Sequence, residues 1–481
     1  MSADFRRSKV VCTIGPASQD PHTFRKLYDA GMDAVRINFS HASHTQAGEI
    51  MSLAEELARA GSRPLAVVAD LQGPRIRVGD LARELSIRSG EVCCFYPEAT
   101  AAPSDASVTH CIPTTYAELA RDITPGDRIL LDDGRLEFGV QGVSGECVLA
   151  ESWSDGSLSS QKGINLPGVC VHAPSLTDKD RCDLAFVSER GVDFVALSFV
   201  RQPEDVVEAR SVMSPDSLLI AKIEKGQALK HLDGIMRVSD GVMVARGDLG
   251  VELPYEEVPL AQKRIIRKAQ EMARPVITAT QMLDSMKSQR RPTRAEVSDV
   301  ANALLDGTDA VMLSAETATG EFPVEAVHTM DRIIRRIEKE RRRPAGSMMQ
   351  RRVWERSEIQ HTPSGAIAAA AMQAVARLGS PFLVTFTRSG FTARIVSAQR
   401  PPVPILAVSD QWRTYNQLAL VWGVHPILFH GEVNYRNMLA CAEKEALERG
   451  FGESGDRFVV TAGVPFHIAG TTNMMRIEEL P

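Results

Sequence analysis

Short apolar runs alternate with helical patterns over the first 70 residues of the chain. The runs VVCTIG, DAVRINF and PLAVVAD have the length and β-branched content of strands, and PHTFRKLYDAG and HTQAGEIMSLAEELARAG lie between them with helical spacing of apolar residues. A strand followed by a helix every ~30 residues is typical of β–α–β units. The pattern therefore predicts three strands of a parallel sheet.

The pattern changes after Pro74 and changes back after Leu176. The intervening segment consists of short β-rich runs separated by Gly and Asp turns, such as GEVCCFYPEA and GDRILLDDGRLEFGV, and ends near KGINLPGV. Five more strand patterns then follow with helices between them: VDFVALSFV, SLLIAKIE, DGVMVARGD, PVITATQ and TDAVMLS. Three strands before the insertion and five after it make eight, over a combined length close to the ~250 residues typical of a (β/α)₈ barrel.

The predicted fold is thus α/β: a (β/α)₈ TIM barrel (1–73 and 170–341), a small inserted β-barrel lid domain after strand 3 (74–169), and a C-terminal α/β domain (342–481). The basic run EKERRRPAGSMMQRR (338–352) predicts a helix end followed by a linker. Beyond it, SGAIAAAAMQAVARLG, PFLVTFT, GFTARIVSAQ and DRFVVTAG again alternate helix with strand, which indicates the C-terminal domain.

Composition narrows the choice of partners. The 481 residues are 44% hydrophobic and 24% charged with a net charge of -6, so a nucleic-acid surface, which usually needs an excess of Lys and Arg, is not expected. No apolar run reaches the ~18 residues of a membrane span, and the start MSADFRRSKVVCTIG lacks the apolar core of a signal peptide. We expect a cytoplasmic protein that binds neither nucleic acid nor membrane.

Polar residues stand at the carboxyl ends of six predicted barrel strands, where barrels place their chemistry. They are Arg36, Asn38 and Ser40 on one face of RINFSH; Asp70; Lys222 and Glu224 on one side of KIE; Arg246 and Asp248 alternating around Gly247; Thr280; and Ser314 and Glu316. A lone Lys-x-Glu is usually an exposed ion pair and a lone RGD a turn. Charges at the ends of apolar strands are costly to bury unless they pair or hold a ligand, so the joint pattern favours a shared site.

The residue types indicate phosphoryl transfer. Glu224 and Asp248 offer hard oxygen ligands for Mg²⁺, with Mn²⁺ as a substitute, and the lack of a His cluster argues against zinc. Arg36, Arg77 and Lys222 can donate to phosphate oxygens. Because the sequence has neither a Walker A loop nor a kinase Gly-rich loop, side chains and the metal would have to hold the phosphates.

Long segments of the chain resemble the pyruvate kinase family, in that family's order. They include KVVCTIGPAS, DAVRINFSH, LLDDG, KGINLPG, AKIE, MVARGDLGVE, ITATQML, PTRAEVSDVANALLDGTDAVMLSAETATG and TRSGFTA, and the resemblance covers nearly the whole length. It implies the same domain layout and the transfer of the phosphoryl group of phosphoenolpyruvate to ADP, giving pyruvate and ATP.

The resemblance also implies roles for residues that match the family's motifs. Glu224 and Asp248 would bind Mg²⁺, Lys222 would stabilise the phosphoryl group in flight, and Arg36 would hold a phosphate. The backbone from Ala245 through Arg246 to Gly247 would seat the substrate carboxylate. Arg77, Asn38, His41 and, from the lid hinge, Lys162 would contact the nucleotide, and closure of the lid would exclude water. Thr280 would lie near the enolate carbon that is protonated, with Ser314 and Glu316 in a proton relay.

The segment TRSGFT (387–392) lies in a turn between a predicted strand and a helix. Its ordinary interpretation is a strand-to-helix turn with a Ser cap. In the family the C-terminal domain often holds a sugar-phosphate effector, and a Gly-containing loop with hydroxyls and free N–H groups suits a phosphate. We expect a sugar-phosphate or AMP effector at Thr387, Arg388, Ser389, Gly390 and Thr392, and an allosteric homotetramer.

The stretch DLQGPRIRV (70–78) departs from the family pattern DTKGPEIRT. In members with that pattern, the Asp and a Thr of this stretch, with residues matching Asn38 and Ser40, help to coordinate K⁺. The substituted positions are Leu71, Gln72, Arg75 and Val78, while Asp70 is kept. An Arg in place of Glu supplies a fixed positive charge that repels a monovalent cation. The stretch resembles the K⁺-independent branch, in which Lys is the usual residue at the Arg75 position, so K⁺ is not expected to be required.

Two other functions fit part of the pattern. A different Mg²⁺-dependent barrel enzyme that acts on an enolate, such as an aldolase or an enolase-like lyase, would share the carboxylates but would not need Lys162 on a lid. A non-catalytic sensor of a sugar phosphate would not need Lys222, Glu224 and Asp248 together.

Overall fold

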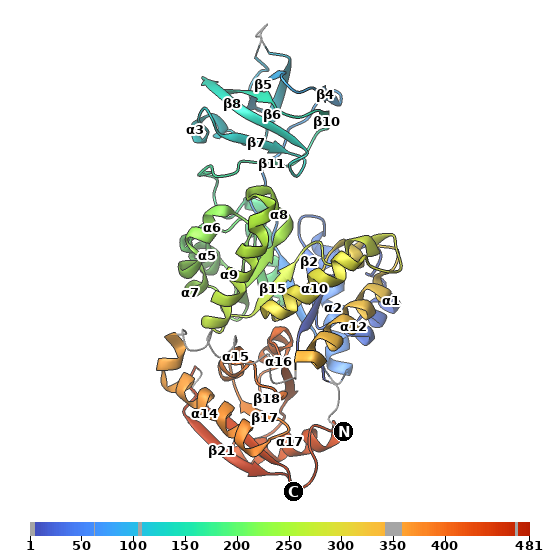
Figure 1. Ribbon diagram of the computed structural model, residues 1–481, viewed down its shortest axis with the longest axis vertical. Coiled ribbons are helices and arrows are strands. Elements are labelled where there is room, and N and C mark those ends of the chain that lie inside the picture. Colours follow the sequence, from blue (N-terminus) through green and yellow to red (C-terminus); the bar gives the residue numbers. More distant parts are fainter. Residues whose placement is uncertain (1–4, 62, 104–107, 342–357, 467–469) are drawn as a thin grey trace.

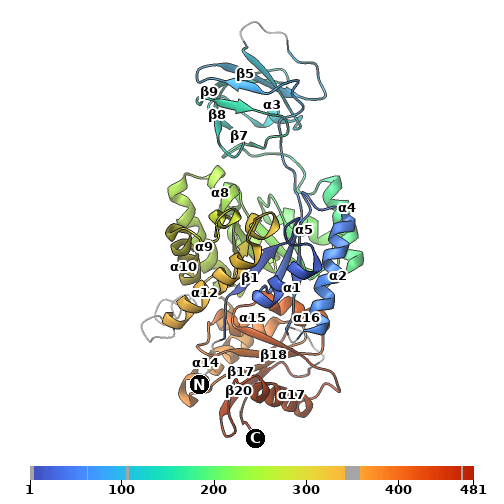
Figure 2. The same cartoon turned by 90° about the vertical axis from the view of Figure 1, so that its right-hand side faces the viewer.

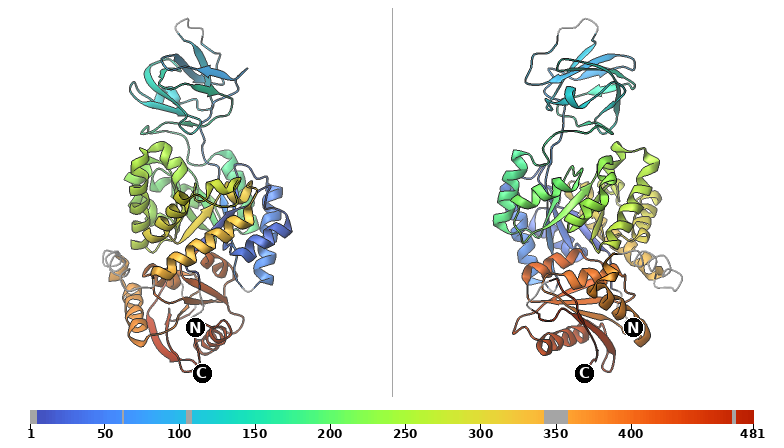
Figure 3. Two further views of the ribbon diagram at one scale, coloured as in Figure 1. Left: turned by 45° about the vertical axis from the view of Figure 1, so that its right-hand side comes forward. Right: turned by 90° about the vertical axis from the view of Figure 1, so that its left-hand side faces the viewer.

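The computed structural model describes residues 5–61, 63–103, 108–341, 358–466 and 470–481. It has three parts stacked along one long axis, as Figure 1 shows: a β lid at one end, a barrel in the middle, and an α/β sheet that contains the C-terminus at the other end. Views from other sides show the same order (Figure 2, Figure 3).

Eight parallel strands close into a barrel, as predicted. Their order around the barrel is β1-β16-β15-β14-β13-β12-β3-β2. Their bounds are β1 Lys9–Thr13, β2 Ala34–Asn38, β3 Ala66–Asp70, β12 Phe194–Leu197, β13 Leu218–Ile223, β14 Gly241–Ala245, β15 Val276–Ala279 and β16 Ala310–Leu313. Almost every residue of these strands is buried, because each strand packs against side chains inside the barrel and against helices outside it.

Helices cover the outside of the barrel and begin where the sequence offers caps. Ser43, Thr177 and Thr293 each cap a helix and form a capping box with the side chain three residues on. Gly307 ends one helix at φ 102°, a conformation that favours glycine. The helices are α1 Pro21–Ala30, α2 His44–Ala60, α4 Asp178–Arg190, α5 Pro203–Val212, α6 Gly226–Lys230, α7 Leu232–Val238, α8 Arg246–Glu252, α9 Val258–Glu271, α10 Arg294–Asp306, α11 Ala315–Ala318 and α12 Pro323–Arg341.

Four aspartates form a ring at the amino ends of the barrel strands. Each directly precedes β2, β12, β14 or β16. Its Oδ2 accepts a hydrogen bond from a backbone N–H near the start of the barrel strand that comes before it in the sequence. The Val10 N–H donates to Asp33 (2.7 Å), the Val67 N–H to Asp193 (2.9 Å), the Leu219 N–H to Asp240 (2.9 Å) and the Val276 N–H to Asp309 (3.0 Å). The four aspartates begin similar segments, DAVRIN, DFVALS, DGVMVA and DAVMLS, so the barrel repeats the same hydrogen bond between a strand and an aspartate four times.

The lid is built from β-strands around its own apolar core. Six strands pair in the order β11-β7-β8-β9-β5-β6, and β4 pairs with β10. Phe95 and Phe138 meet edge to face at 5.4 Å in the core. The elements are β4 Leu85–Ile87, β5 Val92–Pro97, β6 His110–Thr114, α3 Leu119–Asp122, β7 Arg128–Leu131, β8 Leu136–Ser144, β9 Cys147–Ser152, β10 Gly156–Leu158 and β11 Ile164–Asn165.

The C-terminal part is a five-stranded sheet in the order β19-β18-β17-β20-β21, with only β21 antiparallel to its neighbour. Its strands are β17 Leu383–Phe386, β18 Ile405–Ser409, β19 Val424–Leu428, β20 Arg457–Ala462 and β21 Met474–Glu479, and its α-helices are α14 Pro363–Leu378, α15 Phe391–Ala398, α16 Trp412–Gln417 and α17 Tyr435–Glu448. The predicted linker after α12 falls largely on residues 342–357, outside the described ranges, and the domain boundaries remain a prediction.

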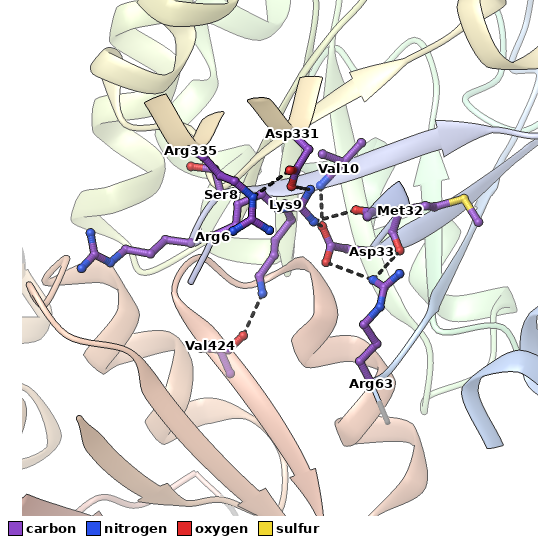
Figure 4. A network of polar contacts seen from close by, with 12 residues as sticks. Arg6, Ser8, Lys9, Val10, Met32, Asp33, Arg63, Asp331, Arg335 and Val424 are labelled. Atoms are coloured by element: carbon purple, nitrogen blue, oxygen red, sulfur yellow. Dashed lines mark hydrogen bonds and ion pairs between the residues drawn. The ribbon is translucent and has the colours of Figure 1, made fainter. Parts of the chain in front are cut away.

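Polar contacts around the start of β1 tie parts of the barrel together and connect it to the C-terminal sheet. Figure 4 shows Arg6 bound to Asp33 and Asp331, at 3.1 Å for the second, while the Lys9 Nζ donates to the Val424 carbonyl at 2.7 Å. Burial lowers the pKa of Lys9 to about 8. The amino end of β1 therefore places a desolvated ammonium directly against the first residue of β19.

Three details of the predicted strand ends are wrong. Strand β14 stops at Ala245, and Arg246 and Asp248 lie in the short helix α8 and not alternately along a strand. Strand β16 stops at Leu313, so Glu316 lies in α11, and Ser40 lies in a turn after β2. The strands end together at the barrel rim, and the chain must turn there to reach the outer helices.

Among the residues that the structure describes, no helix has the length and apolar character to cross a membrane.

Candidate active site

Asp70 is the centre of a cluster of charges at the carboxyl ends of the barrel strands. Its Oδ2 accepts from the Arg36 Nε at 2.6 Å, and its Oδ1 lies 3.2 Å from the Lys222 Nζ. The Lys222 ammonium also lies 3.3 Å from Glu224 Oε2 and donates to Ser198 Oγ at 2.7 Å. The paired strands β2 and β3, together with β13, which is separated from β3 by β12, thus bring together side chains that the sequence predicted for one site.

The Glu224 carboxylate is held with one oxygen engaged and one oxygen open. Oε1 accepts the backbone N–H of Phe199 at 2.6 Å, and Phe199 has a positive φ of 58°. Oε2 is buried and accepts no hydrogen bond from the described residues, with only Lys222 as an ion-pair partner. A buried carboxylate oxygen without a hydrogen bond suits a position that a metal ion fills.

Burial and mutual attraction set the protonation of this cluster. Burial works to raise the pKa of Asp70, but Lys222 and Arg36 outweigh it and the pKa is lowered. Burial alone would lower the pKa of Lys222, yet Asp70, Glu224 and Asp248 raise it. Burial raises the pKa of Glu224, with Asp248 adding to the effect and Lys222 opposing it. The cluster therefore keeps a charged ammonium and an ionised Asp70 in a buried place.

A turn formed by the ends of β14 and β15 lies beside the cluster. The backbone N–H of Gly247 donates to Thr280 Oγ1 at 2.7 Å, and the same hydroxyl donates to the Ala279 carbonyl at 2.6 Å. Thr280 has φ 68°, which a β-branched residue rarely adopts. Its hydroxyl is thereby fixed at the start of α8, next to Asp248.

The Arg246 guanidinium is engaged with other groups of the chain. It pairs with Asp299 of α10 at 2.7 Å and donates to the Thr280 carbonyl at 2.7 Å. Arg246 therefore joins α8 to α10 and to the end of β15, and what it offers a substrate at this position is its backbone.

An open cavity of about 570 Å³ lies between this barrel face and the lid. Asp248, Gly247 and Phe199 line it from the barrel, and Asp133 and Asn165 line it from the lid. Its volume is within the ~300–1,000 Å³ range of small-molecule sites.

Ser314 and Glu316 lie at the end of β16. Both oxygens of the Glu316 carboxylate accept backbone N–H groups, from Ser314 at 2.7 Å and from Leu283 at 3.1 Å. The buried Ser314 hydroxyl has no hydrogen-bond partner among the described residues. Glu316 thus fixes the backbone of the turn, and the Ser314 hydroxyl is left available to a ligand or water.

The residues predicted for the nucleotide lie at the hinge and on the second strand. Lys162 of the lid pairs with Asp132 at 2.8 Å, and the backbone of Arg77 bridges to Gly163. Asn38 accepts the N–H of Ser40 at 3.1 Å. Burial, and after it the charges of Arg75, Arg36 and Arg77, lowers the pKa of the exposed His41, which places this histidine among the three arginines.

The stretch from Asp70 to Arg75 separates into a buried and an exposed part. Asp70 is occupied by two cationic side chains, Leu71 is buried in the barrel core, and Arg75 is exposed and lines the 570 Å³ cavity. In the C-terminal part, Thr387, Arg388, Ser389 and Thr392 line a narrow pocket, and Gly390 caps α15 with φ 76°.

Several residues of the site were not predicted from the sequence. Ser198 accepts from Lys222, Thr13 accepts from Arg36 at 3.0 Å, and the Phe199 N–H binds Glu224. Ser198 follows β12 as the predicted polar residues follow the other strands, so its position alone could have indicated it.

The residues present fit a magnesium ion better than a metal bound by a protein cage. Within the described ranges, no group of three or more His, Cys, Asp or Glu side chains is arranged to hold a metal. Mg²⁺ is commonly bound by one or two carboxylates, with waters and substrate phosphates at its other positions. Glu224 with its open oxygen and Asp248 on the cavity wall supply that number.

Comparisons with known proteins agree with this architecture. The family model described as pyruvate kinase, barrel domain, matches residues 5–327, and the one described as pyruvate kinase, alpha/beta domain, matches residues 365–478. A pyruvate kinase of Agrobacterium vitis is 44% identical and one of Methylorubrum extorquens is 42% identical, and both alignments cover 98% of this chain, with 98% and 97% of the respective relatives. The crystal structure of a pyruvate kinase from Cryptosporidium parvum superposes with a TM-score of 0.92 at 32% identity, covering 99% of this chain and 96% of that one. The chain belongs to the pyruvate kinase family.

Proposed function

We propose that the chain transfers the phosphoryl group of phosphoenolpyruvate to ADP, with Mg²⁺ as the required ion, Mn²⁺ as a substitute, and no requirement for K⁺. The observation that carries the proposal is the buried ammonium of Lys222, which lies within 3.3 Å of both Asp70 and Glu224 at the barrel rim. A fixed positive charge beside a carboxylate with an open oxygen is what a transferring phosphoryl group and its metal require.

The metal would be held by Glu224 and Asp248. When bound, Mg²⁺ supplies positive charge that polarises phosphate oxygens. The pKa of Glu224 is raised without the ion, and the bound ion would supply the positive charge that stabilises the ionised carboxylate.

Lys222 and Arg36 would stabilise the phosphoryl group as it moves. The bond between phosphorus and the enol oxygen breaks, and a terminal oxygen of the ADP β-phosphate forms the new bond. Negative charge spreads over the three equatorial oxygens, which two cations can meet. Asp70 holds the Arg36 guanidinium and the Lys222 ammonium in place for this task.

The enolate left by this transfer takes up a proton on carbon. The Thr280 hydroxyl, held between Gly247 and Ala279, would lie near that carbon. The Ser314 hydroxyl, without a partner among the described residues, and Glu316 would relay the proton from water. The backbone of residues 245–247 would seat the substrate carboxylate.

The nucleotide would bind between barrel and lid. Arg77 and Lys162 would contact its phosphates, and Asn38 and His41 would contact the nucleotide from the barrel. Closing the lid over the 570 Å³ cavity would exclude water, which could otherwise take the phosphoryl group.

Arg75 would replace the monovalent cation. Its side chain is exposed on the cavity wall, so its charge can act on a bound phosphate. Leu71 and Val78 are both buried and offer no side-chain oxygen to an ion, and the remaining residues of that region, Asn38, Ser40 and Asp70, make contacts within the chain.

Regulation and assembly follow as further parts of the proposal. A sugar phosphate or AMP would bind at Thr387, Arg388, Ser389, Gly390 and Thr392, and the protein would act as a homotetramer in the cytoplasm. The domains would be 1–73 with 170–341, 74–169, and 342–481.

Incubation with phosphoenolpyruvate, ADP and Mg²⁺ tests the reaction through the formation of ATP. K⁺ is left out and tetramethylammonium holds the ionic strength, and we expect full activity under these conditions. A large activation by K⁺ would refute the role of Arg75, and the lack of ATP with or without K⁺ would favour a lyase acting on an enolate. Titration with several sugar phosphates and AMP tests the effector.

A further inference from the structure

A second cavity, of about 450 Å³, lies where the lid segments join the barrel. Its walls come from the two connecting segments, from the loop and helix α6 after β13, and from the end of α8. Its volume also falls within the ~300–1,000 Å³ range of small-molecule sites.

The connecting segments separate this cavity from the active-site cavity. On the first segment Arg75 lines the active-site cavity and Pro74 lines the second one. On the returning segment Asn165 lines the active-site cavity and Leu166 lines the second one. Ile76, Ile164 and Phe199 line both cavities and form the wall that the two cavities share.

The body of the second cavity is apolar. Leu166 is 3% exposed and belongs to the lid core, and Val169 and Val171 pack against that core. Leu253 packs against the barrel core from the opposite wall. An apolar occupant would therefore contact the lid core and the barrel core at the same time.

Most charges on the walls are already compensated. The Lys225 ammonium pairs with Glu252 at 2.6 Å, and Arg201 pairs with Asp205 at 3.2 Å while donating to the Val171 carbonyl at 2.6 Å. Lys230, at the end of α6, is exposed and has no ion pair within the described part of the chain. The cavity thus has an apolar body and one end with an uncompensated positive charge.

We propose that this cavity binds a small organic anion, a carboxylate attached to an apolar body. The carboxylate lies at Lys230, and the body lies between Leu166 and Leu253. The site does not depend on the catalytic proposal, because none of its charged residues belongs to the cluster around Asp70.

Octanoate is the first probe, with its binding followed by displacement of 8-anilinonaphthalene-1-sulfonate from the full chain. Lys230→Glu should weaken octanoate binding about tenfold or more, because it reverses the charge at the carboxylate. Lys26→Glu, an exposed lysine on α1, is the matched control and should leave the affinity unchanged. Equal affinity in the wild type and in Lys230→Glu, or the lack of saturable binding, would overturn the proposal.

Two exposed cysteines locate the bound anion. Cys170 lies on the wall of this cavity, whereas Cys182 lies on α4 away from its lining. Saturating octanoate should slow the alkylation of Cys170 by iodoacetamide at least fivefold and leave Cys182 unchanged, as measured by mass spectrometry of peptides. Equal effects on both thiols, or none on Cys170, would show that octanoate binds elsewhere and would refute this site.

Discussion

Asp193 is the one aspartate of the ring that forms no ion pair with an arginine in the described part of the chain. Asp33, Asp240 and Asp309 each bind a guanidinium, of Arg6, Arg210 and Arg400 respectively. Burial raises the pKa of Asp193 to about 7 from 3.8, against the Val67 N–H and Arg413, which lower it. Asp193→Asn removes this charge and keeps a side-chain oxygen for the Val67 N–H.

The sign and size of the effect follow from linkage. Because the pKa is raised in the folded state, the native protein binds more protons than the unfolded chain between pH 4 and 7, so this carboxyl's contribution to stability falls as pH rises. The difference between 3.8 and about 7, at about 1.4 kcal/mol per pH unit, corresponds to about 4 kcal/mol in total. Roughly 2 to 3 kcal/mol of it should appear between pH 5 and pH 8.

Urea unfolding of the wild type and of Asp193→Asn at pH 5 and pH 8, followed by far-UV circular dichroism, measures this difference. The variant should gain roughly 2 to 3 kcal/mol relative to the wild type on going from pH 5 to pH 8. Asp309→Asn is the matched control: it leaves the buried Arg400 without its partner at 2.8 Å and should destabilise by about 3 to 5 kcal/mol at pH 8. A gap between Asp193→Asn and the wild type that stays the same at both pH values would refute a protonated Asp193 in the fold.

Substitutions at three other residues test the active site and the barrel contact. Lys222→Met should lower kcat about 100-fold or more, because the transferring phosphoryl group loses a fixed charge, while near-ultraviolet circular dichroism stays that of the wild type. Without K⁺, Arg75→Glu should lower kcat/KM about tenfold or more and Arg75→Lys should stay close to the wild type; equal rates for the two variants would contradict the role of Arg75. Adding K⁺ to Arg75→Glu should not restore activity, since the side chains of Leu71 and Val78 offer no ligand oxygen. Lys9→Met should be more stable relative to the wild type at pH 7 than at pH 10. Because the pKa of Lys9 is lowered, its buried charge destabilises the wild-type fold below pH 8, and this destabilisation is lost as pH rises to 10.5. A difference in thermal unfolding that is the same at both pH values would refute this effect of the Lys9 charge.

The fold could be predicted from the sequence because its signals are local. Each barrel strand is an apolar run of four to six residues between capped helices, and counting such runs gives eight. Strand ends were predicted less well. The residues after Ala245 and Leu313 continue the polar alternation of a strand in the sequence, but in the structure they lie in helices at the barrel rim. Where a closed sheet ends depends on its neighbours and not on the run itself.

The sequence predicted that the charged side chains of the site would lie together, but the groups that support them were missed. Lys222, Glu224 and Asp70 meet as the alternation of strand residues indicated. The Phe199 N–H that holds Glu224 has no side-chain signature, because it depends on a positive φ that the sequence does not encode locally. The four repeats that begin at Asp33, Asp193, Asp240 and Asp309 were visible in the sequence and also mark the even-numbered strands.

The sequence separations of the hydrogen bonds in the ring of aspartates bear on how the barrel folds. Three of its bonds join residues 23, 21 and 33 positions apart, but the bond from Val67 to Asp193 spans 126, because the lid is inserted there. Closing that longer loop costs about 1 to 1.5 kcal/mol more entropy in an unstructured chain. A lid that folds early pairs Arg77 with Gly163 and reduces the open part of the loop to a few residues on each side. The lid would then have a second role besides covering the active site: it would hold the third and fourth barrel strands close enough to pair during folding.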